Sequence, residues 1–543
     1  MQGNMMNQPL LISQIIQHAE QYHSQAEIVS RTVEGGIHRY TYRDAAARSR
    51  KLAKALSALG IQVGDSIGTL AWNTYRHYEC YFGISGLGAV MNTINPRLFA
   101  EQMTYIVNHS RDRYIMVDAN LLPLLEANAA GFETLEGYIV MTDRAHMPET
   151  RLDNVLCYEE LIEGQDDDYE WPQFDENTAA ALCYTSGTTG NPKGVLYSHR
   201  STMIHAMAAA APDALNISSR TSLLPVVPMF HVNAWGVPYA ASMHGSKMVF
   251  PGPALDGASL WELIDAEQTN LLLGVPTVWL ALLQYMDSIG KTLESVNTVV
   301  VGGSAAPESM IRTFHQKHGA FLLHAWGMTE MSPLGTLTTP TPHMDSLSDE
   351  DRYKLQTKQG KATFGVEMKI LGEDGAELPH DGEAFGRLMV RGPWIVDSYF
   401  RTEGSALEDG WFDTGDVATI DPAGYMQIVD RSKDVIKSGG EWISSIDLEN
   451  AAVGHPDVAE ACVIGAAHPK WDERPLLLAV PVEGREVTLE SVNSFLADKV
   501  AKWWLPDALI QVEALPHTAT GKLHKVPLRE TYYNYLNEQE SAS

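Results

Sequence analysis

The first clear pattern of apolar and polar positions is helical. The stretch TYRDAAARSRKLAKALSALG begins at Thr41, and Leu52, Leu56 and Leu59 recur in it at helical spacing. This spacing places the three leucines on one face of an amphipathic helix. Thr41 with Asp44 three residues later forms a capping-box pattern, and Gly60 is typical of a helix end. We therefore predict a capped helix between residues 41 and 60.

Short apolar runs follow this helix and alternate with further helical stretches. They read SIGTLAWN near residue 66, YIMVD near 114, YIVM near 138 and TVVVGG at 298. Buried strands that alternate with helices indicate α/β layering. After residue 365 the pattern changes to frequent turn signals and alternating apolar positions, which predict an antiparallel β region over 365–430.

The length of the chain predicts more than one domain. A chain of 543 residues is too long for a single hydrophobic core. We predict the α/β class, with a large N-terminal body of several subdomains over 1–430 that includes the β-rich subregion 365–430. A small α+β C-terminal domain is expected over 434–543.

Composition narrows the classes of partner and the compartment. The formal net charge is −29, so the surface should repel phosphate backbones and nucleic acid is not an expected partner. Any anionic ligand then needs a local positive site. The four cysteines form no CxxC pair, which argues against a disulfide framework or a zinc site. The N-terminus lacks a basic, apolar signal pattern, and no apolar run is long enough to span a bilayer, so we expect a cytoplasmic protein.

A stretch rich in glycine and hydroxyl residues stands out at 185–194, where the chain reads TSGTTGNPKG. The apolar run 179–184 before it predicts a strand, and HRSTMIHAMAAAA after it predicts a helix. Strand, glycine loop and helix form a context in which backbone N–H groups can surround a phosphate. The hydroxyl groups and Lys193 would add donors and charge. It is not a Walker A motif, and a simple surface turn remains the alternative.

Further motifs follow in a fixed order along the chain: GGSAAP at 302, HAWGMTE at 324, GWFDTGD at 410, DRSKDVIKSGGEWIS at 430 and PHTATGK at 516. Together with TSGTTGNPKG they resemble the acyl-adenylate-forming superfamily of acyl-CoA synthetases, peptide-synthetase adenylation domains and beetle luciferases. The resemblance implies two half-reactions. A carboxylate first attacks the α-phosphate of ATP to give acyl-AMP and pyrophosphate, and the thiol of CoA then displaces AMP.

The first half-reaction needs charge neutralisation rather than a base, because a carboxylic acid is already ionised at neutral pH. The resemblance implies that a Mg²⁺ ion provides this neutralisation and that Glu330 and Thr185 hold the ion. It also implies four catalytic residues: Lys522, His231, Thr185 and Glu330. Trp326 stands where the family often has tyrosine, so stacking on adenine is kept and a hydroxyl is lost. The implied ATP and AMP contacts are Thr185, Ser186, Gly187, Thr188, Thr189, Gly190, Lys193, Gly303, Ser304, Ala305, Ala325, Trp326, Gly327, Met328, Thr329, Asp416, Arg431 and Lys522.

The second half-reaction is implied to involve movement of the C-terminal domain. Residues 431–433 match the family's hinge, with Lys433 at its key position, and Lys522 would bridge the carboxylate and the α-phosphate before it withdraws. Lys522 also matches a site where a lysine acetyltransferase acts, and acetylation would remove its charge. The alternative is that Lys433 and Lys522 are ordinary exposed surface lysines without a role in the reaction. The CoA tunnel would be lined by Lys437, Ser438, Gly439, Gly440, Glu441 and Trp442, which otherwise read as a β-turn.

The acyl pocket is expected around PMFHVNAWGVPYA at 228. His231 and Trp235 are four residues apart, so they would share a helical face. The resemblance gives His231 a place at the thiol and acyl entry, whereas a buried core histidine is the alternative. The expected wall contains no arginine or lysine, which favours an apolar monocarboxylic acid. It comprises His231, Val232, Trp235, Gly302, Met328, Met331 and Pro333.

Over its whole length the chain resembles medium-chain fatty acyl-CoA ligases and especially bacterial ligases for 3-(methylthio)propanoate, an acid from dimethylsulfoniopropionate breakdown. The resemblance therefore implies 3-(methylthio)propanoate as the substrate. Relatives are often homodimers, so a homodimer is expected. A general short- or medium-chain ligase and a non-catalytic nucleotide sensor remain alternatives. A sensor should have lost Lys193, Glu330, Asp416 or Lys522, and all four are present. Two other functions of the superfamily are less expected. A luciferase would need a luciferin-shaped pocket, and a peptide-synthetase module would need a carrier domain.

Overall fold

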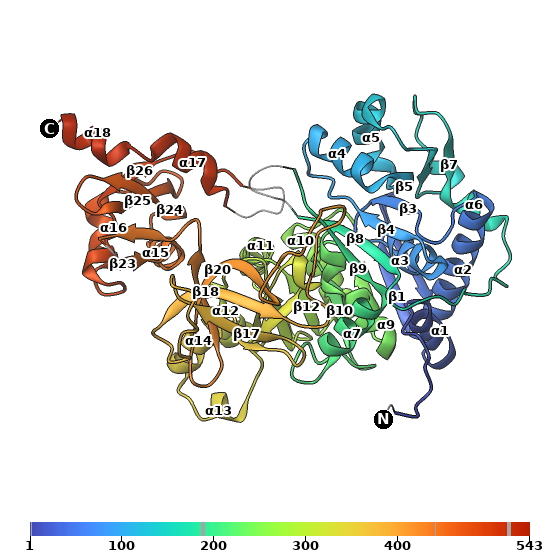
Figure 1. Ribbon diagram of the computed structural model, residues 1–543, viewed down its shortest axis with the longest axis horizontal. Helices are drawn as coiled ribbons and strands as arrows, with labels where there is room; N and C mark the ends of the chain where they lie inside the picture. The colour runs from blue at the N-terminus through green and yellow to red at the C-terminus, as the bar shows by residue number, and fades with distance from the viewer. Residues whose placement is uncertain (2, 186–190, 440, 518–522, 543) are drawn as a thin grey trace. The chain divides into compact units, whose positions relative to one another are not determined.

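The computed structural model describes residues 1–543 except 2, 186–190, 440, 518–522 and 543 (Figure 1). Its contacts divide the chain into two compact units. Unit 1 comprises Met1–Thr357, Thr363–Val366 and Gly392–Ala406, and unit 2 comprises Lys358–Ala362, Glu367–Arg391 and Leu407–Ser543. The domain boundary at 430 and the hinge at 431–433 stay predictions.

The first sheet of unit 1 runs in the order β15-β14-β13-β12-β10-β11-β1-β2. Pairing is parallel from β14 to β1, with an antiparallel neighbour at each end of this run. The first β-strands of the chain thus lie beside strands that come more than 200 residues later, such as β11. The bounds are β1 Glu27–Arg31, β2 Ile37–Thr41, β10 Ser222–Pro225, β11 Lys247–Phe250, β12 Leu271–Gly274, β13 Thr298–Val301, β14 Phe321–Gly327 and β15 Leu334–Leu337.

The second sheet of unit 1 runs in the order β7-β6-β5-β3-β4-β8-β9. It is parallel except for the final pair, β8 with β9. The bounds are β3 Ser66–Leu70, β4 Val90–Thr93, β5 Asp112–Val117, β6 Gly137–Val140, β7 Val155–Cys157, β8 Ala179–Tyr184 and β9 Gly194–Ser198.

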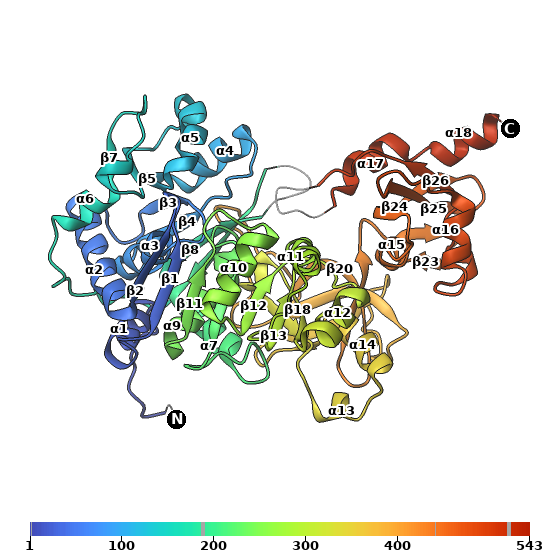
Figure 2. The ribbon, with the colours of Figure 1, turned by 180° about the vertical axis from the view of Figure 1, so that it is seen from behind.

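Helices cover both faces of each sheet. Apolar side chains from α10, α11, α12 and α14 pack on one face of the first sheet, in front of its strands in Figure 2. Side chains from α4 and α5 pack on one face of the second sheet. The two remaining faces share one core with α1, α2, α3, α6, α7 and α9. The helices are α1 Ser13–Tyr22, α2 Tyr42–Ala58, α3 Tyr75–Leu87, α4 Ala100–Ser110, α5 Leu122–Asn128, α6 Tyr158–Glu163, α7 His199–Ala210, α9 Val237–His244, α10 Gly257–Glu267, α11 Pro276–Ile289, α12 Glu308–His318, α13 Pro342–Asp345 and α14 Asp349–Thr357.

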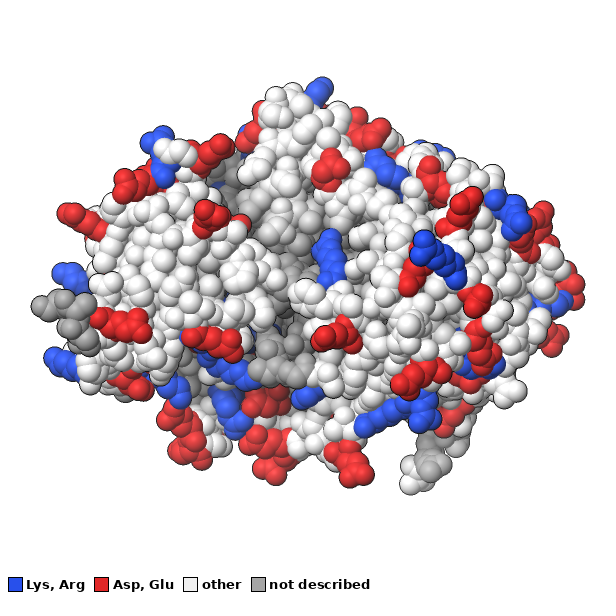
Figure 3. Space-filling view, turned by 90° about the horizontal axis from the view of Figure 1, so that it is seen from above, with Lys and Arg blue, Asp and Glu red and all other residues white. Residues whose placement is uncertain are grey.

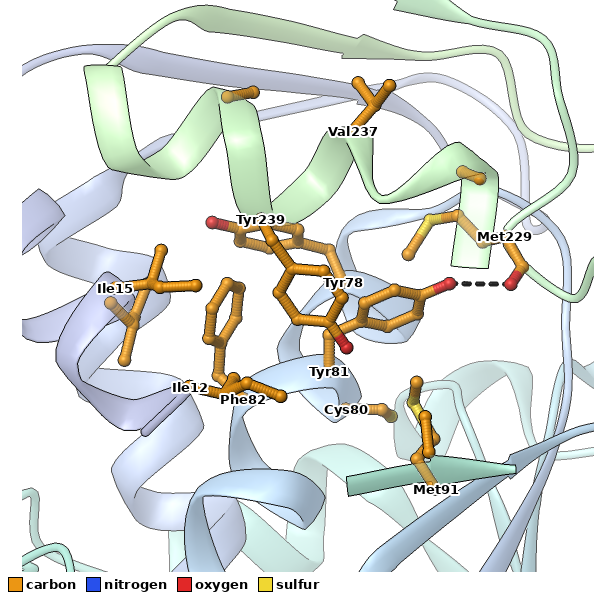
Figure 4. Close-up of a cluster of buried hydrophobic side chains, with 14 of the residues drawn as sticks. Ile12, Ile15, Tyr78, Cys80, Tyr81, Phe82, Met91, Met229, Val237 and Tyr239 are labelled. Carbon is orange, nitrogen blue, oxygen red and sulfur yellow. Dashed lines mark hydrogen bonds between the residues drawn. The ribbon is translucent and has the colours of Figure 1, made fainter. Parts of the chain in front are cut away.

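Helix α3 is buried along its whole length, because it lies in the core that both sheets share. Figure 4 shows its aromatic side chains packed against α1 and α9. The Tyr81 ring lies 5.4 Å from the Tyr239 ring, and the Tyr81 hydroxyl donates to the carbonyl of Met229 at 2.6 Å. The core therefore fixes the backbone at the start of the predicted acyl-pocket segment.

Unit 2 contains an antiparallel sheet, β17-β18-β20-β19 with β21 beside β20, and a second sheet, β23-β22-β25-β24 with β26 beside β25. Helices α15 and α16 pack on one face of the second sheet, and α17 and α18 contribute to a separate apolar cluster. The bounds are β16 Lys361–Ala362, β17 Glu367–Leu371, β18 Phe385–Arg391, β19 Leu407–Glu408, β20 Trp411–Ile420, β21 Met426–Arg431, β22 Ile436–Ser438, β23 Glu441–Ile443, α15 Ser445–Val453, β24 Val458–His468, β25 Asp472–Pro481, α16 Leu489–Leu496, β26 Ala508–Gln511, α17 Lys525–Tyr532 and α18 Tyr535–Ala542.

The α/β class, the buried strands near 66, 114, 138 and 298, and the antiparallel region are confirmed. The capping box at Thr41 and Asp44 forms as predicted at the start of α2. Within the described residues, no helix is long and apolar enough to cross a membrane.

Candidate active site

The described ends of the glycine-rich stretch adjoin two paired strands rather than a strand and a helix. Its two ends are joined, because the Thr185 amide donates to the Lys193 carbonyl at 2.9 Å. Strand β9 follows at Gly194 and pairs antiparallel with β8, and α7 begins only at His199. The predicted strand over 179–184 and the predicted helix from His199 are confirmed as β8 and α7. Their direct succession is wrong, because GVLYS forms β9 between the loop and the helix. Predicted contacts at 186–190 lie outside the described residues.

Glycines shape the hairpin between β14 and β15, which carries most of the HAWGMTE motif. A Cβ on Gly327 would lie 1.9 Å from the Pro333 carbonyl oxygen, so only glycine fits there. A Cβ on Gly335 would lie 2.6 Å from the Trp326 ring. The half-buried indole of Trp326 thus packs against the opposite strand at a glycine. This contact fixes the ring that the sequence predicts for adenine.

Glu330 is held within this hairpin by a tyrosine. It lies on a short 3₁₀ helix, Thr329–Met331, and is only 8% exposed. Its Oε1 accepts a hydrogen bond from the Tyr399 hydroxyl at 2.9 Å, and the Lys193 ammonium lies 4.6 Å from the centre of the Tyr399 ring. Burial, and then the Glu330 carboxylate, raise the pKa of Tyr399, so its hydroxyl stays a donor. Tyr399 therefore joins Glu330 and Lys193, two residues that the sequence predicts for phosphate and metal binding.

The segment after His231 has an uncommon backbone. Residues 232–236 have φ angles between 48° and 73°, so α8 (Val232–Trp235) is a left-handed turn. For residues other than glycine this conformation costs about 1–2 kcal/mol each. The prediction that His231 and Trp235 share a helical face is therefore wrong, since it assumed a right-handed helix.

Buried polar contacts hold this turn in place. The Asn73 side-chain oxygen accepts from the Met229 amide at 2.7 Å, and its amide group donates to Val227 at 2.9 Å. The Cys183 thiol donates to Asn233 Oδ1 at 3.4 Å. A Cβ on Gly236 would lie 2.7 Å from Nδ1 of His205, so the turn ends directly against that ring.

His205 also supports the opposite side of the predicted acyl wall. Its Nε2 accepts from the Leu334 amide at 3.2 Å, next to Pro333. Burial lowers the pKa of His205 to about 3, so the ring is neutral and can accept this bond. One buried histidine therefore positions both the left-handed turn and the chain that carries Pro333.

Two of the predicted wall residues contact each other in unit 1. The Trp235 ring lies on Gly302, where a Cβ would be 2.8 Å from its Cη2. Val232 and Met331 are buried, whereas His231 is half-buried. Gly303 has a φ of 83°, and Ser304 beside it is exposed. The predicted GGSAAP turn thus begins where β13 ends.

Unit 2 brings two further predicted nucleotide contacts together, Asp416 and Arg431. Asp416 on β20 and Arg431 on β21 are paired in register, and Arg431 Nε lies 2.9 Å from Asp416 Oδ1. Asp416 is 3% exposed. Lys433 is exposed in the turn that follows, where the Ser432 amide donates to Gly415 at 3.0 Å. The carboxylate and guanidinium are therefore pre-oriented toward each other.

The predicted CoA segment is a short hairpin of β22 and β23. The Gly439 amide donates to the Trp471 carbonyl at 2.7 Å, and a Cβ on Gly439 would lie 2.8 Å from the Trp471 ring. The Lys437 amide donates to Glu473 at 3.0 Å, and the Ser438 hydroxyl accepts from Arg474 at 3.2 Å. Gly440 and Lys522 lie outside the described residues.

Comparison with family models identifies two segments of the chain. Residues 16–400 match the model described as AMP-binding enzyme, and residues 447–522 match the AMP-binding enzyme C-terminal domain. The chain belongs to the AMP-binding enzyme family. The first match alone covers more than half of the sequence.

Relatives of this AMP-binding enzyme match it from end to end. A 3-methylmercaptopropionyl-CoA ligase from Ruegeria lacuscaerulensis is 52% identical over 537 residues, which is 99% of this chain and 100% of the relative. A medium-chain-fatty-acid–CoA ligase from Ectopseudomonas oleovorans is 50% identical over 543 residues, with 100% of both chains covered. A crystal structure of the anthranilate CoA ligase AuaEII with anthranoyl-AMP shares the fold, with a TM-score of 0.86, 23% identity and 100% of both chains covered.

The acidic residues fit a magnesium ion that is bound mainly by phosphate. Among the described residues, no group of three or more His, Cys, Asp or Glu side chains could hold a metal. Mg²⁺ normally takes one or two protein carboxylates and completes its shell with water and substrate phosphates. Glu330, a buried carboxylate oriented by Tyr399, is suited to this role in an AMP-binding enzyme.

Proposed function

We propose that this AMP-binding enzyme is an ATP-dependent acyl-CoA ligase of the AMP-forming class. The observation that carries the proposal is the identity of about half of all positions, over full length, with ligases named for CoA thioester formation. The reaction joins a carboxylic acid to CoA and converts ATP to AMP and pyrophosphate. ATP, Mg²⁺ and CoA are thus the small molecules that the enzyme requires.

The residues of the candidate site divide this work. Lys193 would neutralise phosphate charge and Glu330 would hold Mg²⁺, which screens the anionic phosphates from the incoming carboxylate. Asp416 and Arg431 would bind the ribose, and Trp326 the adenine. Lys522 would contact the carboxylate and the α-phosphate, so acetylation of Lys522 would stop adenylation. Lys433 would be the hinge between the half-reactions.

The acid is proposed to be 3-(methylthio)propanoate. Two arguments support this choice: a full-length relative at 52% identity is named for that acyl group, and the predicted wall carries no cationic side chain. An acid with a second carboxylate would lack a partner there. The Trp235 indole on Gly302 limits the room, so short and medium chains are favoured over long ones. A general medium-chain ligase is the second candidate, supported by the relative from Ectopseudomonas oleovorans.

Product analysis tests the proposal. The protein is incubated with ATP, Mg²⁺, CoA and one of 3-(methylthio)propanoate, butyrate, hexanoate or palmitate, and AMP and acyl-CoA are quantified. We expect equal amounts of AMP and acyl-CoA, with the highest kcat/KM for the methylthio acid. Hexanoate far ahead would favour the second candidate. Folded protein that forms no AMP with any of the acids would contradict the ligase function and favour a nucleotide sensor.

A further inference from the structure

Helix α17 carries two cations that bind carboxylates near one short segment of chain. Lys525 and Arg529 are four residues apart, so they lie on the same face of the helix. Arg529 pairs with Asp434. Lys525 is 9% exposed, and its Nζ lies 2.5 Å from the Ser445 hydroxyl and 2.7 Å from Glu449 Oε1. Burial alone would lower the pKa of Lys525, but Glu449 and then Asp430 raise it, so the ammonium stays charged.

Asp430 belongs to the same buried cluster. It is 1% exposed, and its Oδ2 accepts from the Ser445 amide at 2.7 Å, the first N–H of α15. Its Oδ1 accepts from the Arg431 amide at 2.7 Å. Beside it, the Ser444 hydroxyl donates to the Val429 carbonyl at 2.5 Å. The last residues of β21 are therefore bound directly to the start of α15.

These contacts fall into two classes with respect to residues 431–433. The pairs Lys525–Glu449 and Arg529–Asp434 join residues that all follow this segment, so a rotation about it leaves them intact. The bonds from Asp430 to Ser445 and from Ser444 to Val429 cross it. A rotation at 431–433 must therefore break the bonds of the second class, whereas the ion pairs of the first class can stay.

We propose that Asp430 is a latch that positions the C-terminal domain for one of the two half-reactions. Its buried carboxylate caps α15 and faces Lys525, so it favours the contact between β21 and α15 within unit 2 over an arrangement reached by rotation. The proposal rests on the proposed function, because only a two-step ligase with a hinge at 431–433 needs a second orientation. Lys525 follows Lys522, the residue proposed to contact the α-phosphate, by three positions in the sequence.

The test measures the half-reactions separately in the whole protein. Adenylation is followed as pyrophosphate release from ATP and acid without CoA. Thioester formation is followed by mixing the purified acyl-adenylate of the same acid with CoA. Asp430→Ala removes a charge-assisted bond, which should shift the ratio of the two rates roughly tenfold or more, one rate rising as the other falls. Trypsin should also cleave the exposed 431–433 segment faster than in the wild type.

Asp434→Ala is the matched control, because it breaks an ion pair to the same helix on one side of the hinge. It should leave the ratio of the two rates unchanged. Asp430→Asn keeps an acceptor for the Ser445 amide but loses the attraction to Lys525, so it should give an intermediate ratio. If Asp430→Ala does not fold, the ratio of the two rates in Asp430→Asn alone tests the latch.

Two results overturn the latch and can be told apart. If the Asp430 variants lower both rates in equal proportion, the residue is structural and the ligase function stands. If the wild type shows neither half-reaction with any acid, the proposed function fails and the latch fails with it.

Discussion

Tyr399 is the residue through which two parts of the candidate site meet. Its hydroxyl donates to Glu330, and its ring lies under Lys193. His205 does comparable work in the core, since it touches Gly236 and binds the Leu334 amide. Neither residue belongs to a motif, yet each sets the position of residues that do.

Replacing Tyr399 by phenylalanine separates these two contacts. Tyr399→Phe keeps the ring for Lys193 but loses the bond to the Glu330 carboxylate, a type of bond worth about 1.5–3 kcal/mol. We expect kcat/KM for adenylation to fall about tenfold and the Mg²⁺ concentration for half-maximal rate to rise. Tyr197→Phe is the control, because that hydroxyl binds the Thr329 carbonyl at 2.6 Å rather than a carboxylate. An unchanged Mg²⁺ dependence in Tyr399→Phe would contradict this role.

Asp112 gives the stability of unit 1 a pH dependence. It is fully buried and accepts from Ser66 at 2.6 Å and from Asn92 at 2.7 Å, with burial raising its pKa to about 7. The folded state therefore keeps the proton at pH values where the unfolded chain releases it, so stability falls as pH rises from about 4 to about 7. Asp112→Asn removes this loss.

We expect the gain in unfolding free energy from Asp112→Asn to be roughly 2 kcal/mol larger at pH 8 than at pH 5. Urea unfolding at the two pH values measures it. A gain of equal size at both would show that the carboxyl group does not titrate between them.

At the level of elements, the left-handed turn at 232–236 and strand β9 are the two features that the local sequence pattern did not predict. The turn carries part of the PMFHVNAWGVPYA segment, and β9 follows the TSGTTGNPKG stretch. The turn ends at Gly236, whose φ of 73° and contact with His205 leave no room for a side chain.

Gly236→Ala tests how tightly the turn is held. Alanine in this conformation costs about 1–2 kcal/mol, and crowding against His205 adds about 1–3 kcal/mol. Gly290→Ala is the matched control, since Gly290 has a φ of 65° with open space around it. Thermal unfolding should show a larger loss for Gly236→Ala, together with weaker acid binding. Equal losses would mean that His205 moves aside.

Much of the fold could be predicted from local sequence patterns. Thr41 and Asp44 are three residues apart, and the buried strands are continuous apolar runs, so neither needs tertiary information. Strand β9 was missed because its five residues directly follow a glycine loop. HVNAWG carries no left-handed signal, since four of the five positions with positive φ are not glycine. Tyr399 lies 69 residues from Glu330, and only the fold brings them together.

At the scale of the whole molecule, the negative net charge should affect the rate at which charged substrates bind. The net charge is −29, and Figure 3 shows acidic and basic side chains dispersed over the face in view. ATP and CoA are anions, so the long-range field opposes their approach.

Salt should therefore speed the approach of CoA. Raising the ionic strength from 0.01 to 0.1 M shortens the screening length from about 30 to about 10 Å. We expect the second-order rate constant for CoA binding, measured by stopped flow, to rise over this range. A steep decrease would mean that local positive charge at the site outweighs the net field.

Helix α3 has a consequence for how unit 1 comes apart. Because all of its residues are buried in the core that both sheets share, neither sheet can separate without exposing it to water. Cooperativity should therefore extend across the two sheets, and calorimetry should record a single unfolding transition for them. A fragment that ends before β10 would leave this helix uncovered and should aggregate rather than persist as an independent module.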